Sequence, residues 1–195
     1  MDERLKKQIE FILEIDQEKN ITRQTHLSHQ GRNENDAEHA WHMAIMAYLL
    51  QEYANEKIDI GKVMIMCLIH DIVEIDAGDT YAYDAVGLSS QKEREDKAKE
   101  RIFSILPEDQ KKELMGIFDE FEEYRTPEAK FAHAMDNFQP LLLNDNNDGG
   151  DWVEHGVEAK MVYGRQAKTK LGSQTLYEVT DAILQKHIEK GHIKE

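Results

Sequence analysis

The sequence predicts an all-α fold built as a single-domain helical bundle, and three observations support this prediction. Apolar residues recur three and four positions apart along most of the 195 residues, which is the period of an amphipathic helix. Proline and glycine are scarce, at 3 and 11 residues, so long helices are permitted. No repeat or low-complexity linker divides the chain, and its length suits one domain with a sizeable core.

Each expected helix follows from its apolar period together with a residue that caps or starts a helix. Polar, turn-rich segments at 21–35, 75–89 and 144–151 are expected to be loops, and no strand of consequence is predicted. The first three helices are expected over 2–20, from Asn35 to about Tyr53 with Glu38 completing a capping box, and from Asp59 to about Val73. The next begins at a capping box of Ser90 and Glu93 and runs to Leu106, and another starts with Pro107 as its first helical residue. A further helix starts at Thr126-Pro127, with Pro140 as a kink or interruption, and one or two closing helices span about 152–190.

The strong acidity of the chain argues against binding to duplex nucleic acid. Its 24 Lys+Arg and 39 Asp+Glu give a net charge of −15, whereas duplex binding depends on neutralising phosphates. A small phosphorylated substrate stays compatible with this charge, because a divalent ion and one or two arginines can reverse the local sign inside a site.

Cysteine content and the lack of a long apolar stretch indicate a cytoplasmic protein. Cys67 is the one cysteine, so the chain forms no internal disulfide, which fits a reducing compartment. Residues 1–7 are charged and lead into an amphipathic segment, unlike a signal peptide. No apolar stretch reaches the ~18 residues of a membrane span, so no membrane partner is expected.

Histidines and carboxylates stand at the ends of apolar segments in three parts of the chain. His70-Asp71 ends the apolar run 63–69, His39 lies upstream of it, and Asp136 lies downstream. Burying such polar groups unpaired costs ~2–7 kcal/mol, and a bound metal ion would remove that cost. Two imidazoles and two carboxylates are a ligand set suited to a divalent metal. The sequence therefore predicts a metal site, which points to hydrolytic chemistry.

Each of these residues also has an ordinary explanation when it is taken alone. His39 could be solvated near its helix start, His70-Asp71 could be an ion pair at a helix end, and Asp136 could pair with a lysine. Their combination favours the metal, while His133 stays open as a ligand or as a partner of one. The remaining candidates are expected to be structural, with Cys67, Met43, Met46, Met64 and Met66 in the core and His26, His29, His42, His187 and His192 at the surface or in structural contacts.

The order His…His-Asp…Asp resembles the HD-domain superfamily of metal-dependent phosphohydrolases, and more narrowly its 5′-deoxynucleotidase branch. The resemblance covers roughly residues 1–170 and is specific at the level of motifs. It implies a helical HD domain over residues 1–195, with the metal-site core at about 35–140, that is often a homodimer. The matching segments are Arg-Gln-Thr at 23–25, Glu-Asn-Asp-Ala-Glu-His-Ala-Trp at 34–41, His-Asp-Ile-Val-Glu-Ile-Asp-Ala-Gly-Asp at 70–79 and Asp-Asn-Phe-Gln-Pro-Leu at 136–141.

The resemblance also implies a ligand set for the metal. One divalent ion would be held by His39, His70, Asp71 and Asp136, with open positions for water and a phosphate oxygen. Because imidazole ligands suit transition metals better than Mg, we expect Mn, Co, Fe or Zn.

Three further residues receive roles from the resemblance. Glu74 would orient or deprotonate the attacking water, Asp79 would lie near the phosphate or sugar, and Arg23 would contact the substrate. In characterised members of this branch, a tryptophan near that arginine packs on the sugar. Gln-Thr-His at 24–26 occupies that region here.

Together these residues predict an enzyme that hydrolyses deoxyribonucleoside 5′-monophosphates to deoxyribonucleosides and phosphate. A carboxylate such as Glu74 can accept the proton of a metal-activated water, and an arginine offers a planar fork to a phosphate. An HD hydrolase acting on an alarmone or a nucleoside triphosphate is disfavoured, because the short chain has no extra basic pocket for a polyphosphate. A non-catalytic regulatory domain is a third possibility, and Glu74 and Asp79 beside the full ligand set argue against it.

Overall fold

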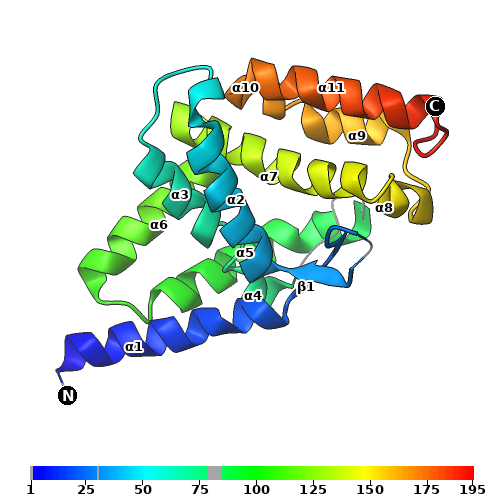
Figure 1. The fold of residues 1–195 in the computed structure, drawn as a ribbon. Helices are drawn as coiled ribbons and strands as arrows, with labels where there is room; N and C mark the ends of the chain where they lie inside the picture. The colour runs from blue at the N-terminus through cyan, green and yellow to red at the C-terminus, as the bar shows by residue number, and fades with distance from the viewer. Residues whose placement is uncertain (1, 30, 79–84) are drawn as a thin grey trace.

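The structure, a computed structural model, describes residues 2–29, 31–78 and 85–195, with the backbone alone over 85–90. Within these residues it is all-α apart from a short pair of strands, which confirms the predicted fold class (Figure 1). No described helix is long and apolar enough to span a lipid bilayer. The elements in chain order are α1 (Glu3–Ile15), the 3₁₀ helix η1 (Asp16–Asn20), β1 (Thr22–His26), β2 (Asn33–Asn35), α2 (Asp36–Leu50), the 3₁₀ helix η2 (Gln51–Tyr53), α3 (Ile60–Ile69), α4 (Glu74–Ala77), α5 (Ala85–Phe103), α6 (Glu108–Glu123), α7 (Pro127–Asn146), α8 (Gly150–Glu154), α9 (Ala159–Gln166), α10 (Thr169–Gly172) and α11 (Gln174–Glu189).

Several predicted helix starts are confirmed by the capping contacts that define them. Asn35 Oδ1 accepts a hydrogen bond of 2.9 Å from Glu38 N, and Glu38 Oε2 accepts one of 3.0 Å from Asn35 N. The side chain of Asp59 accepts from two N–H groups of α3, and that of Thr126 accepts from one N–H group of α7. Such caps satisfy the N–H groups that every helix start leaves without a partner.

The loop predicted over 21–35 is wrong, because this segment contains the antiparallel strands β1 and β2. Their register pairs His26 with Asn33. The strands are polar, and contacts with other elements hold them in place: the N–H and the Nδ1 of His26 both bond to the carboxylate of Asp151 on α8. The hairpin thereby fixes Arg23 against the helical bundle.

The predicted boundaries around the third and fourth long helices also differ from the structure. α3 ends at Ile69 instead of near Val73, and residues 70–73 form a turn that leads into α4. α5 already begins at Ala85, so the helix start predicted at Ser90 is wrong. The predicted loop over 75–89 therefore includes most of α4 and the first turn of α5.

Two predictions that rest on proline need correction. Pro107 immediately precedes α6 instead of starting it. Pro140 lies inside α7, which continues to Asn146 without interruption. A proline removes one N–H group, here the donor to the carbonyl of Asp136, and the surrounding packing keeps the helix continuous. The predicted loop over 144–151 accordingly contains the end of α7 and the start of α8.

Two apolar clusters form the core and meet at the turn 70–73. The larger lies among α2, α3, α7 and the C-terminal helices, and the smaller among α1, α5 and α6. Cys67 is buried in the larger cluster, and Ile72 is buried in the smaller one. Apolar burial on both sides therefore fixes His70 and Asp71 between the clusters. The predicted core positions are confirmed for Met43, Met46, Met66 and Cys67, which are buried, and Met64 packs against them partly buried.

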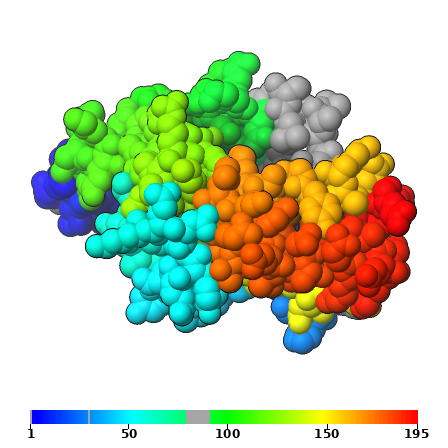
Figure 2. All heavy atoms as spheres, turned by 90° about the horizontal axis from the view of Figure 1, so that it is seen from above, coloured from blue at the N-terminus to red at the C-terminus, as the bar shows by residue number. Residues whose placement is uncertain are grey.

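The C-terminal helices pack on α7, and α10 crosses it closely. Figure 2 shows α10 and α11, in orange, beside the cyan segment that follows α2. Asn55 N donates to Gly172 O at 3.0 Å, and Ser173 Oγ donates to Tyr53 O at 2.7 Å. Gly172 permits the close crossing, because a Cβ atom there would lie 2.2 Å from the carbonyl oxygen of Lys130 on α7. This packing brings α9 to the side of α7 that carries Asp136.

Candidate metal centre

His39, His70 and Asp136, which we call the central cluster, come together from three parts of the chain. One possible ligand atom of each lies within 4.8 Å of those of the other two. His39 stands in the first turn of α2, His70 directly follows α3, and Asp136 lies on α7. Both histidines are buried, whereas Asp136 lines a cavity.

Each histidine of the central cluster is fixed through Nδ1 and presents Nε2 to the cluster. His39 Nδ1 lies 3.0 Å from Gln139 Oε1, and His70 Nδ1 lies 2.9 Å from the carbonyl oxygen of Cys67. The orientation of the Gln139 amide follows from its Nε2, which donates to Glu34 Oε2 at 2.9 Å. Because a carbonyl oxygen only accepts, each Nδ1 carries the donated proton, and in the neutral ring the lone pair is on Nε2. Contacts of this kind orient metal-ligating histidines in proteins.

Within the described chain, His70 Nε2 is a buried nitrogen that makes no hydrogen bond. Asp71 Oδ2 lies 3.0 Å away but outside hydrogen-bond geometry. His39 Nε2 lies 3.3 Å from Asp136 Oδ1 and 4.0 Å from Asp71 Oδ2. A buried nitrogen left without a partner costs about 1–3 kcal/mol, which a bound cation would remove. The set of nitrogen and oxygen donors therefore fits a divalent metal ion.

Asp71 differs from the other predicted ligands because it also pairs with Arg23. Arg23 Nη1 donates to Asp71 Oδ2 at 2.7 Å and to Asp36 Oδ1 at 3.1 Å, and its Nε lies 3.7 Å from Glu34 Oε1. The single positive charge of the guanidinium thus offsets part of the negative charge of three carboxylates. Asp71 lies at the edge of the central cluster, and its carboxylate is close to both histidines as well as to Arg23.

The charged groups at this site shift one another's pKa. Burial alone would lower the pKa of His70, but the Asp71 and Asp136 carboxylates raise it to about 9. Burial would raise the pKa of Asp136, yet the hydrogen bond that the protonated form of His39 donates to it and nearby positive charges hold it well below its ordinary range. Burial and the Asp71 carboxylate raise the pKa of Glu18, behind the site, to about 8. This concentration of negative charge favours a cation among the carboxylates.

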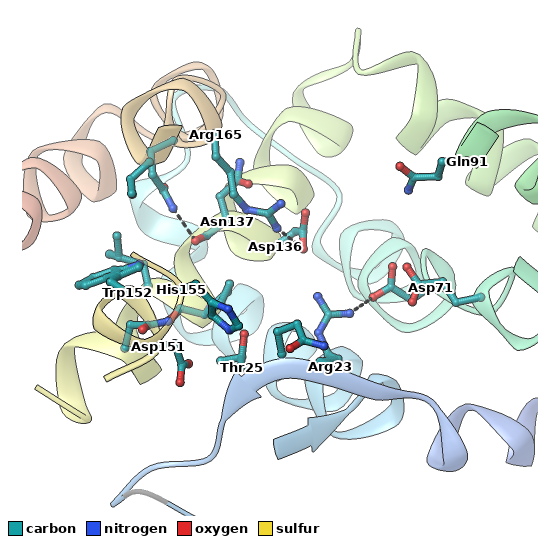
Figure 3. Close-up of a pocket in the computed structure, with 17 residues that line it drawn as sticks. Arg23, Thr25, Asp71, Gln91, Asp136, Asn137, Asp151, Trp152, His155 and Arg165 are labelled. Atoms are coloured by element: carbon teal, nitrogen blue, oxygen red, sulfur yellow. Dashed lines mark hydrogen bonds and ion pairs between the residues drawn. The ribbon is translucent and has the colours of Figure 1, made fainter. Parts of the chain in front are cut away.

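A cavity of about 190 Å³ opens beside the central cluster, lined by residues of β1, α4, α7, α8 and α9 (Figure 3). Glu74, the first residue of α4, is buried and contributes to the lining. The turn 70–73 separates it from His70, and Glu74 N donates to Asp71 O at 2.8 Å. Asp79, predicted beside the phosphate or sugar, lies outside the described residues.

His133 makes a structural contact between α7 and α6. Its Nε2 lies 3.0 Å from the carbonyl oxygen of Phe121, and its ring stacks on the Phe121 ring with centroids 3.9 Å apart. Burial lowers the pKa of His133 to about 4, so the ring is neutral at pH 7 and Nε2 donates to that carbonyl. His133 is therefore held by Phe121 and is not part of the central cluster of possible ligands.

Two residues at the site have no role in the predictions from sequence. Gln139 orients His39, and its position three residues after Asp136 on α7 was a signal for it, because such residues share a helix face. Arg165, on α9, approaches Asp136 with its Nη2 3.8 Å from Asp136 Oδ1. No motif surrounds Arg165, and its place depends on how α9 packs against α7.

Comparison with known proteins identifies the class. A family model described as the HD domain matches residues 15–177, so this chain belongs to the HD domain family. The chain is also similar to the crystal structure of a predicted metal-dependent phosphohydrolase from Magnetospirillum magnetotacticum MS-1. The two are 44% identical with a TM-score of 0.95, and the match covers 100% of this chain and 97% of the other.

Curated relatives carry a more specific name. The human protein named 5′-deoxynucleotidase HDDC2 is 30% identical over 111 residues, which cover 57% of this chain and 53% of that protein. The Xenopus laevis protein of the same name is 27% identical over 135 residues, covering 69% of this chain and 66% of its own. The chain thus spans between about half and two thirds of the length of these two relatives.

Proposed function

We propose that this chain is a metal-dependent phosphohydrolase that converts deoxyribonucleoside 5′-monophosphates to deoxyribonucleosides and phosphate. The observation that carries the proposal is the pair of buried imidazoles, His39 and His70, which both present Nε2 beside Asp136 and an open cavity. The names of the HDDC2 relatives and of the similar bacterial structure support the class of substrate and the use of a metal.

The proposed ligands of the metal are His39, His70, Asp71 and Asp136. When bound there, a divalent ion would polarise a phosphoryl oxygen and lower the pKa of bound water. Imidazole donors favour Mn, Co, Fe or Zn over Mg.

The roles proposed for the other residues follow from their places around the cavity. Glu74 is proposed to accept a proton from the attacking water, because its carboxylate lines the cavity near the predicted ligand Asp71. Arg23 holds Asp71 and Asp36 in place and is proposed to contact the substrate from β1. Asp79 keeps its proposed role near the phosphate or sugar.

A substrate screen tests the proposed activity. Protein stripped of metal with a chelator should be supplied with one divalent metal at a time. Phosphate release should then be assayed from matched deoxyribo- and ribonucleoside 5′-monophosphates and from a deoxynucleoside triphosphate. A site packed against C2′ leaves an added hydroxyl crowded or unpaired, so we expect a preference for deoxynucleotides of roughly ten- to a hundredfold in kcat/KM. Equal rates on both sugars, or faster release from the triphosphate, would contradict the assignment to 5′-deoxynucleotides.

A homodimer is proposed from the apolar side chains that α2 exposes. Trp41 and Leu49 are 62% and 64% exposed, and Ile45 and Tyr48 lie exposed between them at helical spacing. A contiguous apolar stripe of this kind is typical of an interaction surface. Sedimentation of the wild type and of Leu49→Glu tests it, with a shift to the monomer expected in the variant.

The remaining proposals concern domain division and compartment. We propose one HD domain over residues 1–195 with its metal-site core at about 35–140, and the match to the HD domain model over 15–177 supports this division. The cytoplasm is the proposed compartment, supported by a single cysteine, Cys67, whose thiol is buried and free.

A further inference from the structure

Arg165 enters the cavity from α9 and is held there by its neighbours in the sequence. Val162, one turn earlier, is buried in the core. Gln166, the next residue, is buried, and its Nε2 donates to the carbonyl oxygen of Asn137 at 2.8 Å. Asn137 directly follows Asp136, so this hydrogen bond ties the end of α9 to the part of α7 that carries the predicted ligand. Figure 3 shows Arg165 beside Asp136, across the cavity from Arg23.

The two arginines that line the described part of the cavity differ in their contacts with carboxylates. Arg23 is 12% exposed and lies against the three carboxylates of Glu34, Asp36 and Asp71, with direct hydrogen bonds to two of them. Arg165 is 29% exposed, and its approach to Asp136 at 3.8 Å is too long for a hydrogen bond. Within the described part of the chain, the guanidinium of Arg165 makes no direct hydrogen bond and so has donors to offer beside the central cluster.

We propose that Arg165 binds the phosphate group of the substrate, with its guanidinium donating to phosphate oxygens next to Asp136. This inference rests on the proposed phosphohydrolase function. A phosphate dianion that enters the cavity meets the carboxylates of Asp136 and Glu74, so it requires positive charge in addition to a metal ion. A guanidinium supplies that charge in a planar fork that matches two phosphate oxygens.

The competing explanation is that Arg165 only holds Asp136 in place. An arginine with that single role would be expected to make a short, direct contact, as Arg23 does with Asp71 at 2.7 Å. The longer approach of Arg165 leaves space for an anion to bridge the guanidinium and the centre. The two explanations differ in a measurable way, because a positioning residue acts on metal content and a phosphate-binding residue acts on anion affinity.

Isothermal titration calorimetry of inorganic phosphate binding to metal-replete protein separates these two explanations. The variants are Arg165→Ala and Arg165→Lys, and Arg125→Ala is the matched control because Arg125 is 82% exposed and 3.9 Å from Glu123. Loss of a charged hydrogen-bond pair predicts phosphate affinity lower by about ten- to a hundredfold in Arg165→Ala. Arg165→Lys should recover part of the loss, Arg125→Ala should match the wild type, and metal content should stay unchanged.

The outcomes also separate this inference from the proposed function. Wild-type phosphate affinity in Arg165→Ala overturns the role of Arg165, as does a loss that disappears once the variant is saturated with metal. A wild-type protein that binds no phosphate overturns it as well. If the wild type hydrolyses no deoxynucleotide but Arg165→Ala still weakens phosphate binding, then the substrate assignment fails and the role of Arg165 stands.

Discussion

Histidines and carboxylates gather in three places among the described residues, and two of these clusters are held in different ways. In the central cluster, His39 and His70 each bond through Nδ1 to a carbonyl oxygen and turn Nε2 inward. The distal cluster consists of Asp148, His187 and His192, near the C-terminus, and its possible ligand atoms also lie within 4.8 Å of one another.

Hydrogen bonds satisfy the distal cluster without an ion. His187 Nε2 lies 2.8 Å from Asp145 Oδ1, and His187 Nδ1 lies 3.0 Å from His192 Nδ1. Asp148 pairs with Lys190 at 2.7 Å. The same residue types therefore give a hydrogen-bonded tie between α7 and α11 in one place and a candidate metal centre in the other. The difference is that His70 Nε2 in the central cluster makes no hydrogen bond within the described residues, whereas both ring nitrogens of His187 in the distal cluster are bonded.

The largest expected effect is on kcat in a Glu74 variant, and it separates the chemical step from metal binding at the central cluster. Glu74→Gln keeps the shape of the side chain but removes the proposed proton acceptor. We expect kcat to fall about 10²–10⁴-fold while metal content and fold stay as in the wild type. Steady-state kinetics on the best 5′-deoxynucleotide checks this, with Glu123→Gln as an exposed control. A metal-replete Glu74→Gln with near-wild-type kcat would remove the role.

The next effect concerns His133, a histidine outside both clusters. Burial lowers its pKa to about 4 in the folded chain, against ~6.5 when unfolded. Between these values the unfolded state binds the proton and the folded state does not. The contribution of His133 to stability is therefore fully present above pH ~6.5 and is lost as the pH falls through about 4.

Urea unfolding at a series of pH values measures this contribution. The free energy of unfolding should fall by at most about 1.4 kcal/mol per pH unit on account of this group. His133→Gln should flatten that dependence, whereas the exposed His155→Gln should leave it unchanged. An equal slope in all three proteins would show that His133 is not buried in its neutral form.

A smaller effect tests the partners that orient the rings of the two clusters. Gln139→Met removes the acceptor of His39 Nδ1, and metal affinity should fall by about ten- to a hundredfold. Asp145→Asn changes the partner of His187 and should leave metal affinity unchanged. Calorimetric titration of Mn or Co into both variants, after a chelator has removed their metal, checks this difference in metal affinity. Equal affinities in the two variants would contradict the difference drawn between the clusters.

Local sequence signals predicted most of the fold. Caps such as Asn35 and Thr126 act through neighbours within three residues, so their helices could be located from sequence alone. The strands β1 and β2 could not, because their polar residues gain their place from distant contacts such as that of His26 with Asp151. The turn at 70–73 was missed for a similar reason, since its two flanks belong to different apolar clusters.

The residues that lie close together at the candidate site could be picked out from the sequence where they stand in short motifs. His39, His70, Asp71 and Asp136 stand beside apolar runs that the fold brings together, and their proximity agrees with the prediction. Arg165 has no such setting. It reaches Asp136 only because α9 packs on α7, a long-range contact that no pattern around residue 165 encodes.

Metal analysis of purified single variants tests whether the central cluster, and not the distal one, binds the metal ion. Wild-type protein and variants His70→Ala and His192→Ala should be loaded with Mn or Co, desalted and analysed by mass spectrometry of the metal, with circular dichroism as the check on folding. About one ion per chain is expected in the wild type and in His192→Ala, and a large loss of metal is expected in His70→Ala. Full occupancy in a folded His70→Ala, together with loss of metal in His192→Ala, would place the metal at the distal cluster and contradict a metal centre at His39, His70 and Asp136.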